Sequence, residues 1–285
     1  MMRSMFAAVS GLRNHQTMMD VLSSNISNVN TFGYKSQRAT FKDSLYQNLS
    51  GAGAPVPPST GGTNPRQVGL GMSLNSIDTL MTQGNAQSTG VVTDMMIQGD
   101  GFFRVAAAGA TFGGVGGNDQ TAGGELYTRA GNFSFDSQGY LVTTKGQYVL
   151  GTVAGTGNIG RLQVDPATTA AINVDAAGGI TAVSTAGVST PIGNLSLAKF
   201  ANAPGLERAG DNMWRVSNNS GPAVNGAPGG VAGHGNIVPG ALEMSNVDLA
   251  LEFTNMIIAQ RGFQANSRAI TTSDDMLQEL VNLKR

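Results

Sequence analysis

The chain has 285 residues, enough for one large domain or for two to three modest ones. Charged residues make up 12% of it and the net charge is −1, which excludes a basic nucleic-acid-binding surface and a highly charged disordered chain. There are no cysteines, so disulfide bonds, thiol catalysis and cysteine metal sites are also excluded.

The first 29 residues predict a helix with an apolar stripe. Apolar side chains occupy most a and d positions of a heptad, as in a coiled coil or helix bundle. Gln16 and Ser23 interrupt the stripe. The apolar run after Arg3 is short, so we expect no cleaved signal peptide. The apolar stripe positions are Met2, Met5, Val9, Leu12, Met19 and Ile26.

The middle of the chain has the composition of a β-rich body. Of the 40 glycines, 37 lie between Gly51 and Gly240. Residues 50–66 are rich in Gly, Pro, Ser and Thr, which indicates a loop or linker. Loops are also expected at 106–124 and 221–235. From Met81 onward short apolar runs alternate with turn residues, which predicts short antiparallel strands at 95–97, 102–105, 133–135, 140–142, 148–150, 195–197 and 214–216.

Residues 247–285 predict a second long helix, with Ser245 as its capping residue and Asp248 three positions later. Its a/d stripe is interrupted by Gln260, Ser267 and Asp274. Interrupted stripes weaken a two-helix pair, so we expect neighbouring copies of the chain to complete it. The apolar members of this stripe are Leu249, Phe253, Met256, Phe263, Ile270, Leu277 and Val281.

These elements predict an α+β fold with two terminal helices in a coiled-coil-like pair and a central antiparallel β domain. We expect three parts. Residues 1–29 and 247–285 form the helical part, 30–80 and 222–246 a connecting region, and 81–221 the β-rich outer domain.

No catalytic constellation is visible. His15 and His234 have no acid or nucleophile at a useful spacing, so packing or surface roles are expected for both. Asp274 and Asp275 project about 100° apart on a helix, which favours a solvated face over a metal site. No dinucleotide or Walker motif is present. We therefore expect no enzyme activity, cofactor or metal.

The segments that carry a family resemblance are 10–12, 20–35, 97–103, 127–133, 243–248 and 256–284. Together they resemble the rod and hook proteins of the bacterial flagellum. They differ from the family pattern at Ser24, where asparagine is usual, and at Ser27, where alanine is usual. The resemblance covers nearly the whole chain.

Within this family the segments 40–43, 61–64 and 270–285 are most similar to short hook proteins. The resemblance implies a structural subunit of the hook, a curved hollow tube that transmits motor torque as a universal joint. The alternative is the distal rod protein, part of a rigid drive shaft. The helices would line the tube. The expected assembly residues are Met5, Val9, Leu12, Met19, Ile26, Leu249, Phe253, Met256, Phe263, Ile270, Leu277 and Val281.

The resemblance also implies a route and a location. Subunits leave the cell through the flagellar type III export apparatus, and Phe41 and Leu45 match the export-gate motif of the family. A helical i, i+4 apolar contact is the other interpretation of this pair. The expected partners are further copies, the distal rod protein, the hook cap and the hook–filament junction proteins, outside the cell, with no nucleic acid and no membrane insertion.

Two other classes compete with a self-assembling subunit. A secreted β-rich adhesin on a coiled-coil stalk predicts a cleaved export signal and a stripe at one end of the chain. A β-rich enzyme predicts convergent acids or a histidine-based site. The sequence shows neither pattern.

Overall fold

A computed structural model describes residues 2–55, 61–106, 124–155, 157–230 and 233–283. The chain forms two compact units. The first consists of Met1–Ser27, Gln37–Leu80 and Asp248–Arg285, and the second of Asn28–Ser36 and Met81–Val247. The predicted α+β class is confirmed, with a helix near each end of the chain and short antiparallel strands between them.

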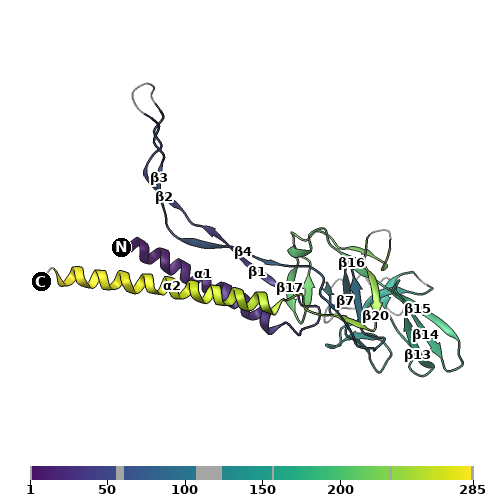
Figure 1. Cartoon of the computed structure of the whole chain (residues 1–285). Coiled ribbons are helices and arrows are strands. Elements are labelled where there is room, and N and C mark those ends of the chain that lie inside the picture. Colours follow the sequence, from purple (N-terminus) through teal and green to yellow (C-terminus); the bar gives the residue numbers. More distant parts are fainter. Residues whose placement is uncertain (1, 56–60, 107–123, 156, 231–232, 284–285) are drawn as a thin grey trace. The chain divides into compact units, whose positions relative to one another are not determined.

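The first unit contains the two long helices, α1 (Met2–Ser27) and α2 (Leu249–Asn282), which run side by side in opposite directions (Figure 1). Asp248 caps α2, because its side chain accepts hydrogen bonds from the backbone N–H groups of Ala250 and Leu251. A carboxylate at this position also suits the helix dipole. The predicted cap, Ser245, is wrong, since its hydroxyl accepts from Val247 N at 3.3 Å, ahead of the helix.

Two antiparallel strand pairs complete the first unit. They are β1 (Gln37–Asp43) with β4 (Met72–Thr79), and β2 (Tyr46–Ser50) with β3 (Arg66–Gly69). Hydrogen bonds from Ser44 N to Gly71 O and from Leu70 N to Leu45 O continue one pair into the other. The prediction of a loop or linker at 50–66 is therefore wrong in part, because Ser50 pairs with Arg66 at the end of the β2–β3 hairpin (Figure 1). Residues 56–60 of this segment lie outside the described residues.

The second unit is built from antiparallel sheets. The larger ones have the strand orders β17-β18-β8-β7-β16-β19 and β12-β11-β15-β14-β13. The pairs β10-β9, β20-β6 and β21-β5 lie beside them in the same unit. A short 3-10 helix, η1 (Ala203–Gly205), joins β16 to β17. The strands are β5 (Ala86–Ser88), β6 (Met95–Gln98), β7 (Phe102–Ala106), β8 (Glu125–Thr128), β9 (Phe133–Phe135), β10 (Leu141–Thr143), β11 (Leu150–Val153), β12 (Ile159–Arg161), β13 (Thr169–Val174), β14 (Gly179–Ser184), β15 (Ser189–Leu195), β16 (Leu197–Lys199), β17 (Glu207–Gly210), β18 (Met213–Arg215), β19 (Val224–Gly226), β20 (Asn236–Pro239) and β21 (Ala241–Glu243).

Each apolar run predicted as a strand lies on one of these strands or directly beside it. The expected loop at 221–235 contains the short strand β19. The expected loop at 106–124 lies mostly outside the described residues.

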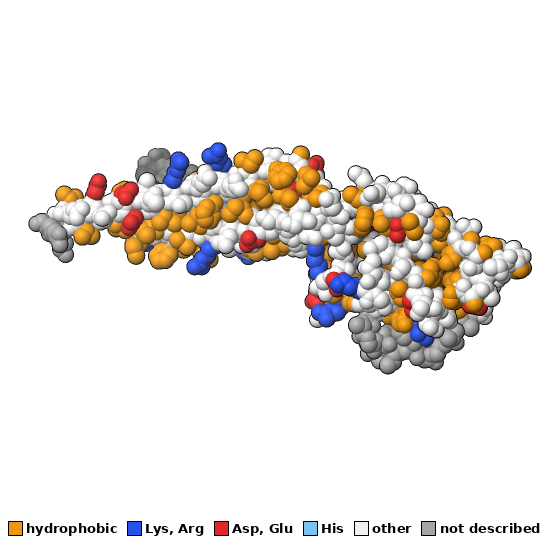
Figure 2. Space-filling view, turned by 90° about the horizontal axis from the view of Figure 1, so that it is seen from below, with side chains coloured by type: hydrophobic (Ala, Val, Ile, Leu, Met, Phe, Trp, Pro, Cys, Tyr) orange, Lys and Arg blue, Asp and Glu red, His pale blue; other side chains and the backbone are white. Residues whose placement is uncertain are grey.

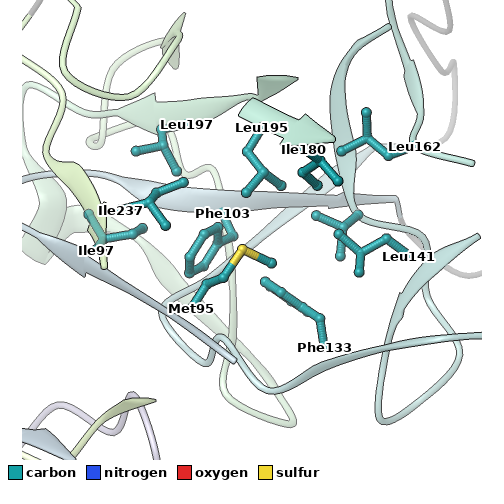
Figure 3. Packing of buried hydrophobic residues seen from close by; sticks show 11 residues of the cluster. Met95, Ile97, Phe103, Phe133, Leu141, Leu162, Ile180, Leu195, Leu197 and Ile237 are labelled. Carbon is teal, nitrogen blue, oxygen red and sulfur yellow. The ribbon is translucent and has the colours of Figure 1, made fainter. Parts of the chain in front are cut away.

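Most of the apolar runs contribute to one main core, where Phe103 and Phe133 pack edge to face with ring centroids 5.0 Å apart (Figure 3). Phe102 and Trp214 belong to a second cluster of the same unit. Burying a large apolar side chain contributes roughly 1.5–3 kcal/mol, so this core can hold the second unit together. Its members are Met95, Ile97, Phe103, Phe133, Leu141, Val149, Leu162, Ile180, Leu195, Leu197 and Ile237.

A buried ion cluster holds residues 28–36 within the second unit. Lys35 Nζ lies 2.6 Å from one oxygen of Glu243, and Arg129 lies 3.2 Å from the other. Lys35 also donates to Thr82 O at 2.7 Å. Burial lowers the pKa of the Lys35 ammonium group, while Glu243 opposes this shift. Gly33 brings the segment in close at φ +68°, since an added β-carbon would lie 2.6 Å from Ala130 N.

Candidate assembly surface

The two helices of the first unit meet along a line of small and polar residues. A β-carbon added to Gly11 of α1 would lie 2.7 Å from the Asn266 amide nitrogen of α2. One added to Gly262 would lie 2.6 Å from Cε1 of the His15 ring. Asn25 Nδ2 donates to Glu252 Oε1 at 3.1 Å. We call these residues the seam: Gly11, His15 and Asn25 of α1, with Glu252, Gly262 and Asn266 of α2.

The seam has one constant antiparallel register. His15 lies four residues after Gly11 on α1, and its neighbour Gly262 lies four residues before Asn266 on α2. Asn25 lies ten residues after His15, and its partner Glu252 lies ten residues before Gly262. The same register places Met18 opposite Ala259, which is fully buried. The intrachain contact therefore follows a heptad-like row of its own, shifted from the predicted apolar rows.

Asn25 also joins the helix pair to the adjoining strands. Its Nδ2 donates to Gln37 O at 2.8 Å, and its Oδ1 accepts from Gln37 N at 2.9 Å. Farther toward the start of α1, Asn14 Nδ2 donates to Met72 O at 2.8 Å. Ser10 Oγ accepts from Met72 N at 3.3 Å. Polar side chains thus hold α1 to α2 and also to β1 and β4.

The predicted assembly residues lie elsewhere on the helices. None of them is buried within the chain, and Phe253 and Val281 are half or more exposed. The interrupting residues Gln16, Gln260 and Ser267 are exposed as well. Because the seam is formed by other residues, the apolar rows of both helices are left partly or fully open. We call the predicted rows the outer stripes: Met5, Val9, Leu12, Met19 and Ile26 on α1, and Leu249, Phe253, Met256, Phe263, Ile270, Leu277 and Val281 on α2.

Further large apolar side chains on the same helices are exposed. Figure 2 shows hydrophobic side chains gathered along the helical part of the molecule, with only scattered charged groups. Contiguous exposed apolar surface of this kind marks an interaction site. The additional exposed residues are Met2, Phe6, Leu251, Ile257, Ile258, Met276 and Leu280, with Leu283 directly after α2.

Glu252 is the one charged member of the seam and is only 8% exposed. Burial raises the pKa of its carboxyl group; the hydrogen bond from Asn25 opposes the shift, and the negative charge of Asp248 adds to it. The second carboxylate oxygen, Oε2, is buried with no hydrogen-bond partner among the described residues. An unmet buried acceptor is unfavourable in a single chain.

Phe41 and Leu45, the pair that matches the expected export-gate motif, are not in a helix. Phe41 lies in β1 opposite Leu74 of β4, and Leu45 follows the strand with 75% of its surface exposed. The interpretation as a helical i, i+4 contact is therefore wrong. The role of Phe41 and Leu45 as an export-gate motif stays a prediction.

Both histidines have packing positions. His15 lies in the seam against Gly262. His234 is buried in the second unit, with its Nε2 2.9 Å from Val224 O and Gly226 against its ring. Among the described residues, no group of three His, Cys, Asp or Glu side chains is placed to hold a metal ion. Within that same part of the chain, no helix has the length and apolar character needed to cross a bilayer.

Counting apolar residues could not locate the seam, because the seam consists of glycine, histidine, asparagine and glutamate, which such a count leaves out. A usable signal does exist in the sequence. Each long helix contains a single glycine, Gly11 in α1 and Gly262 in α2. Glycine is unfavourable inside a helix, so an isolated one indicates close approach of another group.

Comparison with protein families gives matches in both units. Residues 5–35 match the family described as "Flagella basal body rod protein". Residues 96–182 match "Flagellar hook protein FlgE/F/G D1 domain". Residues 238–283 match "Flagellar basal body rod FlgEFG protein C-terminal".

Whole-length relatives agree with these matches. The flagellar basal-body rod protein FlgG of Bacillus subtilis is 44% identical over 285 residues, covering 100% of both chains. The FlgG protein of Borreliella burgdorferi is 35% identical over 285 residues, again covering 100% of both. The flagellar hook protein FlgE of the same organism is 31% identical over 445 residues, with 100% of both chains covered. The chain therefore belongs to the family of flagellar rod and hook proteins and is a structural component of the bacterial flagellum.

Proposed function

We propose that this chain is a subunit of the flagellar basal-body rod, the distal rod protein, rather than of the hook. The FlgG alignments of the Bacillus and Borreliella proteins span 285 residues, the length of this chain. The Borreliella hook protein aligns at the lower identity of 31% over 445 residues. Its alignment is longer than the 285 residues of this chain, so the hook protein contains sequence that this chain lacks. Length and identity together favour the alternative reading over the hook.

The subunit assembles with further copies through the outer stripes. One observation carries this proposal: small and polar side chains join the helix pair, and the apolar rows of both helices remain partly or fully exposed. Burial of each large apolar side chain would contribute roughly 1.5–3 kcal/mol, which favours assembly around a common axis. Such a tube would act as a drive shaft that transmits torque from the motor.

The proposed location is outside the cytoplasm, in the flagellar basal body. The chain would reach it through the type III export apparatus, with Phe41 and Leu45 as the export-gate pair. Besides further copies of itself, the proposed partners are the adjoining rod and hook proteins. In this role the chain has no catalytic function.

Assembly is tested with purified full-length chain and its Phe263→Ala variant. Phe263 lies on the outer stripe of α2 and is half-buried. We expect the wild type to form tubes visible by electron microscopy and the variant to require a higher concentration. Fluorescence of Trp214, the sole tryptophan, reports that the second unit stays folded in the variant. Tubes of equal stability from Phe263→Ala would contradict the assigned surface.

Rod and hook are distinguished in a strain that lacks the gene. Electron microscopy of its basal bodies should show incomplete rods. Complete rods without hooks would instead support a hook subunit.

A further inference from the structure

Glu252 lines a small pocket in the first unit. The pocket has a volume of about 120 Å³ and lies between α1, β1 and α2. Its wall includes Leu22, Gln37, Arg38, Glu252 and Asn255. A water molecule occupies about 30 Å³ in the liquid, so the pocket has room for a planar group of about four heavy atoms.

The donors inside the chain are already used. Asn25 donates one Nδ2 hydrogen to Gln37 O and the other to Glu252 Oε1. Arg38, the one basic residue in the pocket wall, has its guanidinium 3.7 Å from Asp78 and is largely exposed. Glu252 Oε2 is left buried and without a partner among the described residues. The pocket therefore has in its wall a carboxylate whose second oxygen is unmet, together with space large enough for a donor group.

The helix pair carries cations of the complementary kind. Four arginines on α1 and α2 are exposed, and within the described chain none has a carboxylate within ion-pair distance: Arg3, Arg13, Arg261 and Arg268. A guanidinium group is planar, weakly hydrated and suited to pairing with a buried carboxylate. On α2 the outer-stripe residues Leu249 and Met256 are the i−3 and i+4 neighbours of Glu252, which connects the pocket to the proposed assembly surface.

We propose that the Glu252 pocket receives the guanidinium group of one of these arginines from a neighbouring copy of the chain. This inference rests on the proposed function, because it requires copies to assemble side by side. The ion pair would satisfy Glu252 Oε2 only in the assembly. The same carboxylate that is unfavourable in the single chain would then select a partner in the correct register.

The first test uses Glu252→Gln, which keeps an acceptor for Asn25 and removes the charge. Glu279→Gln is the matched control, an exposed acid on α2 away from the pocket. We expect the concentration needed for assembly to rise at least about tenfold for Glu252→Gln and to stay unchanged for the control. Assembly of Glu252→Gln at the wild-type concentration would overturn the proposal and would mean that water fills the pocket or that Glu252 is protonated there.

The second test identifies the arginine. Arg3→Gln, Arg13→Gln, Arg261→Gln and Arg268→Gln are each assembled alone and in combination with Glu252→Gln. We expect one of the four to raise the concentration needed for assembly as much as Glu252→Gln does and to add nothing further in the double variant, because both substitutions remove the same ion pair. If none of the four behaves in this way, the proposal is wrong.

Failure of this proposal and failure of the proposed function give different results. If the wild-type chain forms no tubes, the function itself is contradicted. If the wild type and Glu252→Gln form tubes equally well, only the pocket assignment falls.

Discussion

Gly11 of α1 lies directly against Asn266 of α2, and no side chain larger than hydrogen fits between them without displacing the amide. His15 and Gly262 repeat this relationship one helical turn away with the roles of the helices exchanged. Each helix therefore supplies one glycine and receives a polar side chain from the other. This reciprocal arrangement sets the antiparallel register and leaves the apolar residues for the outer face.

The seam predicts a position-specific effect of helix substitutions. Gly262→Leu should destabilise the helix pair by about 1–3 kcal/mol, because the His15 ring occupies the space that the new side chain needs. Ala265→Leu, at an exposed position of the same helix, is the control and should change stability by less than about 0.5 kcal/mol. Urea unfolding of the dilute chain, followed by far-ultraviolet circular dichroism, measures both. Equal effects of the two substitutions would contradict the assigned register.

Asn25 should be among the most sensitive positions of the first unit. Asn25→Ala removes hydrogen bonds to Gln37 and Glu252 at a fully buried site and leaves those partners unmet. A loss of roughly 2–4 kcal/mol is expected, since each unmet buried group costs about 1–3 kcal/mol. Ser23→Ala, at an exposed position of α1, serves as the control. Urea unfolding of the dilute chain measures the loss of stability of both variants. A loss for Asn25→Ala no larger than that for Ser23→Ala would contradict the hydrogen bonds assigned to Asn25.

The buried ion cluster of the second unit predicts that replacing the Glu243 carboxylate by an amide strongly lowers the stability of this unit. Glu243→Gln leaves Lys35 and Arg129 close together without their shared carboxylate, so the second unit should lose roughly 3–5 kcal/mol. Glu207→Gln breaks an exposed pair with Arg215 and should cost no more than about 1 kcal/mol. Denaturant titration followed by Trp214 fluorescence compares them. Similar midpoints for the two variants would show that the cluster contributes little.

The raised pKa of Glu252 predicts that the stability of the unassembled chain depends on pH. Because its pKa is raised in the folded chain, the folded state binds the proton more readily than the unfolded state. This group therefore contributes most to stability at acid pH, and the contribution falls as the pH rises from the ordinary glutamate pKa of about 4.3 through the raised value. Glu252→Gln should remove this slope and make the dilute helix pair more stable at neutral pH.

The measurement is the difference in unfolding midpoint between wild type and Glu252→Gln, taken at several pH values with dilute chain. Subtracting the two removes the titration of the other groups. A difference that does not change with pH would contradict the assigned environment of Glu252. The expected sign is opposite to that in assembled tubes, where the same substitution should weaken the contact.

Much of the architecture was determined by local sequence patterns. Heptad spacing located both helices to within a few residues, and short apolar runs such as Phe102–Val105 located the strands, because each pattern reflects a local backbone period. The strands β1 and β4 were missed, since their residues are mixed in polarity and only half-buried. The family, too, was recognisable from the terminal segments.

The partner of each helix face was decided only by the tertiary structure. Apolar spacing identifies a row of residues that avoids water, but it does not say whether the row is covered by the same chain or by another one. That choice depends on how closely two backbones can approach, and here Gly11 and Gly262 permit the approach along a polar row. The sequence by itself therefore determined the helices, the β-rich middle and the family. Only the fold brought Asn25 to Glu252, because these residues are 227 positions apart and no local pattern connects them.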